Sequence, residues 1–276
     1  MTVGIVGLGL IGGSMAKSIK AHTEHVVLGA DIKDEAISMA KMTGAIDGVL
    51  NDNNLPECDI VMIAISPLPL LSWAEENAHL IKGTLVDLCG VKRNICKELG
   101  TLAQKHGFSY VGGHPMAGKE VSGFANASAA LFSGASMILT PNEKNDIETL
   151  DMLKTFFLEI GFDDITFSTP EEHDRIIAYT SQLAHITSSA YIKSPFSQKH
   201  MGFSAGSYKD MTRVARLDEN LWTELFLENA DFLVDELKIL VENLSDYLDV
   251  LQKGDKEKLR EMLKNGRLLK MSAGGE

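Results

Sequence analysis

Two groups of residues in this sequence have types and spacing that suit chemistry. The first is Gly7-Leu8-Gly9-Leu10-Ile11-Gly12, a GxGxxG pattern, and the second is His114, which lies between a glycine and a proline. A glycine turn that opens a helix can bind a pyrophosphate, because its backbone approaches closely and the helix N-terminus offers free N–H groups. A histidine has a pKa near neutrality, so it can remove a proton from a hydroxyl. Together they predict oxidation of a hydroxyl beside a bound dinucleotide.

Each glycine of the first group has a separate role in such a site. Gly7 permits the tight turn, Gly9 leaves room for the pyrophosphate, and Gly12 lets the helix pack closely on the strand. Roughly twenty residues later the next predicted strand ends in Asp31, where an acid binds the adenosine ribose hydroxyls. A carboxylate there repels a 2′-phosphate, so we expect NAD rather than NADP, a preference that the neighbouring Lys33 weakens.

The nicotinamide half of the cofactor is expected at the carboxyl ends of the strands. Three loops are predicted at that edge: Ser66-Pro67, Cys89-Gly90-Val91-Lys92, and the loop that contains His114. We therefore expect Ser66, Pro67 and Gly90 to border the cofactor. A single histidine is more often a structural side chain, but this position beside the expected nicotinamide favours a general base.

The elements that position these residues alternate between strands and helices. Strands are predicted at 2–6, 25–31, 59–66, 84–88, 110–113, 136–140 and 164–168, and helices at 10–21, 34–42, 70–80, 94–105 and 146–160. This alternation predicts an α/β fold, a Rossmann-type doubly wound sheet covered on both faces. We assign residues 1–168 to an NAD-binding domain.

After Pro170 the strand signal ends and the sequence predicts an all-helical C-terminal domain, residues 169–276. Helices are expected at 171–192, 209–216, 221–251 and 255–265, the last stopped by Gly266, and residues 271–276 are expected to fray. Apolar residues recur three or four apart along 221–251, typical of a long amphipathic helix. Its apolar side is explained equally by an intramolecular core and by a second copy of the chain.

Composition narrows the class of protein. The 276 residues are 45% hydrophobic and 23% charged, with a net charge of −12, which argues against a broad nucleic-acid-binding face. No apolar run approaches the roughly 20 residues of a membrane span. The three cysteines contain no CxxC pair, so neither a disulfide framework nor a metal site is indicated, and a cytoplasmic location is expected.

Residues 112–123, GGHPMAGKEVSG, resemble the GxHPMAG motif of the prephenate and arogenate dehydrogenases. Three further segments agree in order: EHDR at 172–175, SQLAH at 181–185, and GSYKDMTR at 206–213. A fourth, Asn220-Leu221-Trp222 leading to Asn229, resembles the start of the family's tryptophan-containing helix. The resemblance covers nearly the whole chain.

This resemblance implies a reaction in tyrosine biosynthesis. Family members oxidise the C4 hydroxyl of prephenate, pass hydride to NAD, and release carbon dioxide to give 4-hydroxyphenylpyruvate. His114 matches the family's catalytic histidine, and Arg213 matches the arginine that pairs with the side-chain carboxylate of the substrate. Asp210 is one helical turn before Arg213 and is expected to orient it. Lys119, His185 and Gly206 are the further expected substrate contacts. Helix packing explains His185 equally well. Many relatives have threonine at the position of Lys119, which could instead simply face solvent.

The chain departs from the family at Gly90. Relatives commonly read Gly-Ser-Val-Lys in this loop, and their serine contacts both the histidine and the nicotinamide, whereas this chain reads Cys89-Gly90-Val91-Lys92. Another group must then fix His114, and the candidates are a backbone carbonyl of its own loop, an ordered water and Ser122. The His173-Asp174 pair has two interpretations of equal weight, a site feature and an acidic first turn of a helix.

Three classes of protein fit these observations to different degrees. Prephenate dehydrogenase is the leading hypothesis, and arogenate dehydrogenase, whose substrate carries an amine in place of the keto group, is its nearest rival. A non-catalytic dinucleotide sensor would need the glycine turn but neither His114 nor Arg213. A dimerisation module with a vestigial nucleotide fold would not need the glycines with Asp31. We expect an enzyme that forms a homodimer.

Overall fold

The computed structural model describes residues 1–274 of the chain. These residues form two compact units, Met1–Asn229 and a second unit that begins at Ala230. No helix of the described residues is long and apolar enough to cross a membrane. The first unit contains all the residues of the predicted site.

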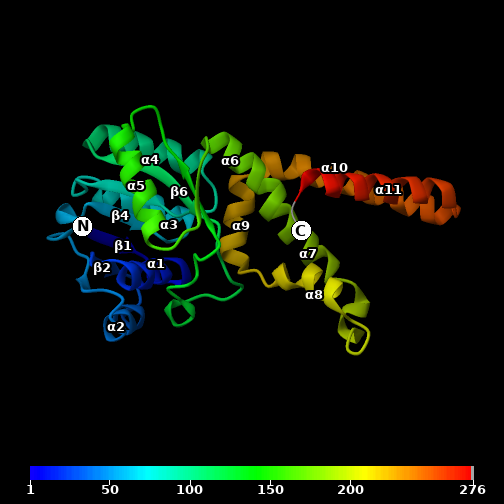
Figure 1. The fold of residues 1–276 in the computed structure, drawn as a ribbon, viewed down its shortest axis with the longest axis horizontal. Helices are drawn as coiled ribbons and strands as arrows, with labels where there is room; N and C mark the ends of the chain where they lie inside the picture. The colour runs from blue at the N-terminus through cyan, green and yellow to red at the C-terminus, as the bar shows by residue number, and fades with distance from the viewer. Residues whose placement is uncertain (275–276) are drawn as a thin grey trace. The chain divides into compact units, whose positions relative to one another are not determined.

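An eight-stranded sheet forms the centre of the first unit (Figure 1). Its strands are β1 (Thr2–Val6), β2 (Val26–Ala30), β3 (Gly48–Val49), β4 (Ile60–Ile63), β5 (Thr84–Asp87), β6 (Ser109–Pro115), β7 (Ser136–Thr140) and β8 (Asp164–Phe167). The order across the sheet is β3-β2-β1-β4-β5-β6-β7-β8. The strands from β3 to β6 are parallel, β7 is antiparallel to β6, and β8 is parallel to β7. The chain order reverses beside β1, and dinucleotides bind at such a switch point.

Helices cover both faces of the sheet, which is why strands such as Ile60–Ile63 are apolar throughout. One face packs against α1 (Leu10–His22), α2 (Asp34–Met42) and α5 (Ile147–Glu159). The opposite face packs against α3 (Pro67–Asn77) and α4 (Arg93–His106). The predicted α/β fold class with a doubly wound sheet is confirmed; the two-residue strand β3 was not predicted.

The helical part of the first unit follows β8. It contains α6 (Pro170–Ile177), a π-helical segment (Ala178–Leu183), α7 (Ala184–Tyr191), α8 (Gly206–Thr212) and α9 (Glu219–Glu228). The helix predicted at 171–192 is therefore continuous but changes its winding in the middle. Leu225 and Trp222 of α9 pack in the core on the α3–α4 face of the sheet. The compact units divide after Asn229, and the division into 1–168 and 169–276 stays a prediction.

The prediction of a single helix at 221–251 is wrong, because the helix is interrupted at Asn229. Asn229 ends α9 with φ −121° and ψ 24°, and its side chain is fully buried. Its amide Nδ2 donates to the carbonyl oxygen of Asp174 and to Oε1 of Gln182, both at 2.8 Å. These tertiary hydrogen bonds account for a break that the apolar periodicity does not reveal.

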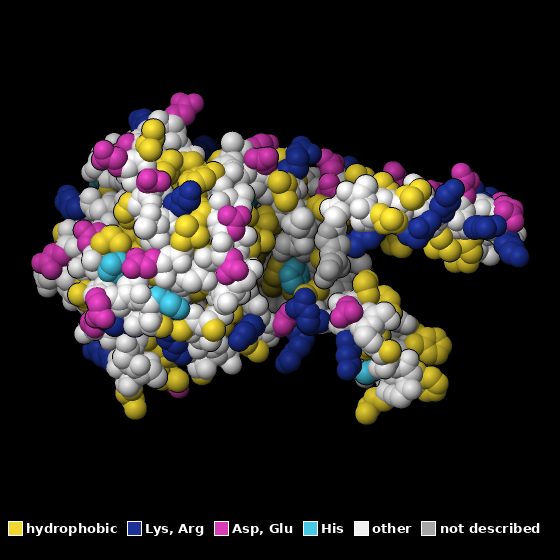
Figure 2. All heavy atoms as spheres, viewed as in Figure 1, with side chains coloured by type: hydrophobic (Ala, Val, Ile, Leu, Met, Phe, Trp, Pro, Cys, Tyr) yellow, Lys and Arg dark blue, Asp and Glu magenta, His cyan; other side chains and the backbone are white. Residues whose placement is uncertain are grey.

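The second unit is a pair of helices, α10 (Ala230–Lys253) and α11 (Lys256–Ala273). The two helices lie side by side (Figure 1). Helix α11 runs through Gly266, so the predicted stop there is wrong; a glycine inside a helix costs about 1 kcal/mol, too little to end it. Residues 271–273 are helical rather than frayed, and residues 275–276 lie outside the described residues. Apolar side chains remain on the surface of this pair (Figure 2).

Candidate active site

The glycine turn between β1 and α1 has the geometry that a bound pyrophosphate needs. Gly7 has φ +90°, and a Cβ built there would lie 2.7 Å from the carbonyl oxygen of Ala64. A Cβ on Gly12 would lie 1.9 Å from the carbonyl oxygen of Gly7, so only glycine permits this helix–strand contact. A Cβ on Gly9 would meet no atom within 4 Å, so open space lies next to the N-terminus of α1. These positions fit a dinucleotide.

Asp31 is held against this turn. Its Oδ2 accepts a hydrogen bond from the backbone N–H of Leu8 at 2.7 Å, and its Oδ1 accepts one from that of Lys33 at 2.9 Å. Because Leu8 belongs to the glycine turn, the carboxylate is fixed beside the expected pyrophosphate position. Its predicted contact with the ribose hydroxyls stays a prediction.

Two glycines place His114 at the end of β6. A Cβ on Gly112 would lie 2.3 Å from Oγ1 of Thr140, and a Cβ on Gly113 would lie 2.8 Å from the carbonyl oxygen of Asp87. The strands on both sides of β6 therefore approach too closely for any larger residue. This explains the glycine pair that precedes His114 at the carboxyl end of the strand.

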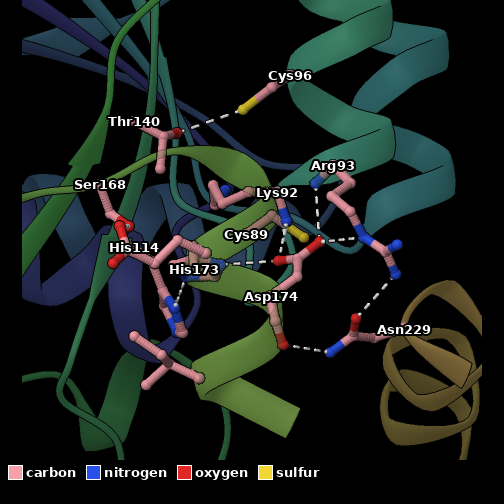
Figure 3. Close-up of polar contacts among 12 residues, drawn as sticks. Cys89, Lys92, Arg93, Cys96, His114, Thr140, Ser168, His173, Asp174 and Asn229 are labelled. Carbon is pink, nitrogen blue, oxygen red and sulfur yellow. Dashed lines mark hydrogen bonds and ion pairs between the residues drawn. The ribbon is translucent and has the colours of Figure 1, made fainter. Parts of the chain in front are cut away.

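His114 forms a hydrogen bond with a second histidine. Its Nδ1 lies 2.8 Å from Nε2 of His173, and the rings meet edge to face with centroids 5.0 Å apart. His173 belongs to the first turn of α6, and its Nδ1 lies 2.7 Å from Oδ1 of Asp174 (Figure 3). Ser122 does not occupy this position; its carbonyl oxygen accepts from Asn126 instead. Among the described residues, the side chain bonded to Nδ1 of His114 is thus His173, which was not among the predicted candidates; the ordered water stays a prediction.

Asp174 is buried and accepts from the start of α4. The backbone N–H of Lys92 donates to its Oδ1 and that of Arg93 to its Oδ2, both at 2.8 Å. Burial raises the pKa of Asp174, but the hydrogen bonds from His173 and from these N–H groups outweigh it and hold the pKa below its usual value. Asp174 is therefore a buried carboxylate hydrogen-bonded to the start of α4, whereas the acidic residues in the first turn of α6 are Glu171 and Glu172.

A buried ion pair lies beneath the two histidines. Lys92 and Asp87 pair with neither side chain exposed, and the hydroxyl of Tyr110 donates to Asp87 at 2.8 Å. Burial, with the nearby His173 and Lys92, holds the pKa of His114 well below 6.5. Burial also lowers the pKa of His173 despite its bond to Asp174. Both rings are consequently neutral near pH 7.

A second cluster contains the predicted substrate residues Arg213 and His185. The Arg213 guanidinium forms an ion pair with Glu120, which follows His114 in the same loop. His185 Nδ1 donates to the carbonyl oxygen of Val214 at 3.0 Å. The centroids of the His185 and Trp222 rings lie 3.9 Å apart. Burial lowers the pKa of His185. The negative charge of Glu120 raises this pKa, and the positive charge of Arg213 lowers it. The cluster thus contains one cation exposed enough to bind an anion.

The remaining predicted residues have different surroundings. A Cβ on Gly90 would lie 3.8 Å from Nε2 of His114, so the loop after β5 does border the histidine. Ser66 and Pro67 begin α3, and Gly206 begins α8. Lys119 and Asp210 are exposed, and among residues 1–274 the partner of Arg213 is Glu120 rather than Asp210. Glu120 was not predicted as this partner; its only signal was its place within the histidine motif.

The arrangement defines a class: a dinucleotide-dependent dehydrogenase with a histidine at the strand edge and a helical segment that completes the site. Comparison with family models identifies the family within this class. Residues 15–164 match the model "Prephenate dehydrogenase, nucleotide-binding domain", and residues 169–265 match "Prephenate dehydrogenase, dimerization domain". The chain belongs to the prephenate dehydrogenase family.

Individual relatives agree with this assignment. The chain is 30% identical to the prephenate dehydrogenase of Bacillus subtilis, over 96% of this chain and 74% of that protein. It is 29% identical to the cyclohexadienyl dehydrogenase of Zymomonas mobilis, over 98% and 95% of the two chains. Its structure is similar to that of Aquifex aeolicus prephenate dehydrogenase in complex with hydroxyphenyl propionate and NAD+, with a TM-score of 0.85, 28% identity, and 99% and 98% of the chains covered.

Proposed function

We propose that this chain oxidises and decarboxylates prephenate, with NAD as the hydride acceptor, and so forms 4-hydroxyphenylpyruvate and carbon dioxide. The observation that carries the proposal is the position of His114: a neutral histidine at the carboxyl end of β6, with Nε2 facing the loop of Gly90. The family assignment supports the substrate. Gly7, Gly9, Gly12 and Asp31 would hold NAD, which supplies the hydride acceptor when bound.

His114 would accept the proton of the substrate's C4 hydroxyl at Nε2. As that proton leaves and the C4–H bond gives up its hydride, the C–O bond becomes a carbonyl. The ring is then a dienone with its carboxylate in the vinylogous β position, so the C–CO2 bond breaks and its electron pair makes the ring aromatic. Burial favours the neutral form of His114 that this step requires.

Arg213 would bind the side-chain carboxylate of prephenate. A planar guanidinium can donate two parallel hydrogen bonds to a carboxylate, and Arg213 is 66% exposed while paired with Glu120. The incoming carboxylate would therefore replace Glu120 as its partner. The contacting aromatic rings of His185 and Trp222 lie next to this cation. The contacts of Lys119, Asp210 and Gly206 with substrate are proposed on the resemblance alone.

Turnover of purified enzyme tests this proposal. Prephenate and arogenate are each offered with NAD and with NADP, and the reduced cofactor and the aromatic product are measured. Prephenate with NAD should give the highest kcat/KM. Preferential turnover of arogenate would assign the activity of an arogenate dehydrogenase instead. No turnover of either substrate would favour the dinucleotide sensor.

We infer that the chain forms a homodimer through α10. Val234, Val241 and Leu248 are spaced by seven residues, as are Leu237, Leu244 and Leu251, the pattern of a helix seam that pairs with another helix. Leu244 and Leu248 are 56% and 58% exposed. The match to a dimerization domain supports the inference.

The three free cysteines support a reducing, cytoplasmic compartment.

Light scattering at micromolar concentration tests the dimer, with two matched variants. Leu244→Glu places a charge in the seam and should shift the mass toward that of one chain. Ile239→Glu changes an equally exposed residue, at 53%, that lies off the seam, and should leave the mass unchanged. A wild-type enzyme with the mass of one chain would contradict the inference.

A further inference from the structure

We propose that His173 and Asp174 set the tautomer of His114, so that Nδ1 of His114 carries the ring proton and Nε2 is free to accept another. The two residues act through His114 and are positioning residues. They orient His114 in a chain that has glycine at position 90, where relatives commonly carry a serine. The inference deepens the proposed role of His114 as a base and rests on that role for its meaning, although the tautomer itself is measurable without substrate.

Asp174 is the fixed end of the chain of hydrogen bonds. Its two oxygens accept the backbone N–H groups of Lys92 and Arg93, each at 2.8 Å, and the Nε of Arg93 lies 3.4 Å from Oδ2. An ionised carboxylate can only accept hydrogen bonds. Since Asp174 is ionised, the nitrogen that lies 2.7 Å from it, Nδ1 of His173, must be the donor.

His173 then has no proton left for its other nitrogen. Its ring is buried, with 1% of the residue exposed, so a second proton would place a positive charge in a medium of low dielectric constant. The charged groups around the two rings are Asp174 on α6, Lys92 and Arg93 at the start of α4, and Asp87 at the end of β5. Asp87 is engaged by Lys92. We therefore place neutral His173 with its proton on Nδ1.

The tautomer of His114 follows from that of His173. Nε2 of His173 is an acceptor, and Nδ1 of His114 lies 2.8 Å from it, so Nδ1 of His114 is the donor. The proton-free nitrogen is Nε2, which lies 3.8 Å from the Cβ position of Gly90. It faces the loop at the carboxyl edge of the sheet, where the reacting hydroxyl is expected.

The same chain of contacts favours the protonated product of the step. When Nε2 of His114 takes up a proton, the ring becomes a cation that donates from Nδ1 to His173. The His173 dipole is oriented by Asp174, whose negative charge lies at the far end (Figure 3). A hydrogen bond that involves a charged group is stronger than a neutral one. His173 therefore orients the base before the step and stabilises it afterwards.

Nitrogen NMR of the full chain labelled with 15N-histidine measures the tautomer directly. The chain contains eight histidines, and the signals of the two rings are assigned with His114→Asn and His173→Gln. At a pH at which His114 is neutral, Nδ1 of His114 should resonate as a protonated nitrogen and Nε2 as an unprotonated one. The reverse pattern would overturn the proposal.

Two substitutions of His173 separate positioning from packing. Gln places an amide oxygen near the former Nε2 and still accepts from His114, whereas Leu fills the space without an acceptor. We expect His173→Leu to lose the single tautomer and to lower kcat by about tenfold, the upper range for one hydrogen bond, with the KM for NAD unchanged. His173→Gln should keep the tautomer and lie between the wild type and His173→Leu in kcat.

Equal losses of kcat in the two variants would show that His173 serves packing only and would contradict the proposal. If neither variant folds, the wild-type spectrum alone decides. A wild-type enzyme that shows the expected tautomer but does not turn over prephenate would refute the proposed function and leave the tautomer assignment intact.

Discussion

The glycine turn and the histidine site differ in how far apart their parts lie in the chain. The turn is built from residues 7–12 and Asp31, which contacts Leu8 from the end of the next strand. The histidine site joins His114 to His173 and Asp174, about sixty residues later, and to the start of α4. The turn is therefore specified by local spacing, and the histidine site by the packing of α6 against α4. This difference predicts which changes each region tolerates.

Loss of His114 should have the largest effect on catalysis. His114→Asn removes the group that accepts the proton in the transition state, so kcat should fall by about 10²-fold or more. The KM for NAD should stay near its original value, because the glycine turn is a separate region. His79→Asn, an exposed histidine on the same sheet domain, is the control. Full kcat in His114→Asn would disprove the general-base role.

The glycine turn should respond differently at two neighbouring glycines. Gly12→Ala places a methyl group against the carbonyl oxygen of Gly7, 1.9 Å from its Cβ position, and should lower the free energy of unfolding by about 1–3 kcal/mol. Gly9→Ala meets open space, so we expect a stability change below about 1 kcal/mol. It should nonetheless weaken NAD binding by about tenfold, because the methyl group occupies the pyrophosphate position. Chemical denaturation and NAD titration measure the two effects, and unchanged NAD affinity in Gly9→Ala would remove the turn from the cofactor site.

Asp31 should decide between the two nicotinamide cofactors. Its carboxylate would repel a 2′-phosphate, so we expect kcat/KM with NAD to exceed that with NADP by at least about tenfold. Asp31→Ser should narrow this ratio, and Asp34→Ser, a change of like charge in the first turn of α2, should not. Steady-state kinetics with both cofactors tests this, and equal use of NADP by the wild type would contradict it.

Gly90→Ser should have the smallest effect. The Cβ position of Gly90 lies in ordinary contact with Leu225 and His114, at 3.6 and 3.8 Å, so a serine fits. Because His173 already orients His114, the added hydroxyl should change kcat/KM by only a few-fold, as one neutral hydrogen bond is worth about 0.5–1.5 kcal/mol. A gain of several orders of magnitude would show that the glycine loop is defective and that the substrate is another compound.

The same contrast explains what could be predicted from the sequence. The limits of β1, α2 and β7 follow from alternation and periodicity, and the structure gives them as predicted. The break at Asn229 could not be predicted, because it depends on hydrogen bonds to Asp174 and Gln182. The partner of His114 was missed for the same reason: His173-Asp174 has the composition of an exposed first turn, and only the packing of α6 buries it. Local spacing identified His114 but not what holds it.

The pH dependence of kcat/KM for prephenate tests the central claim, that His114 is a general base with a lowered pKa, most directly. Burial, His173 and Lys92 lower the pKa of the free enzyme's base below 6.5, and the base must be unprotonated to act. Activity should therefore stay level as the pH falls toward 6.5 and decline only below it, and His114→Asn should lack this acid limb. An acid limb centred at or above 6.5, or one that persists in His114→Asn, would contradict the account.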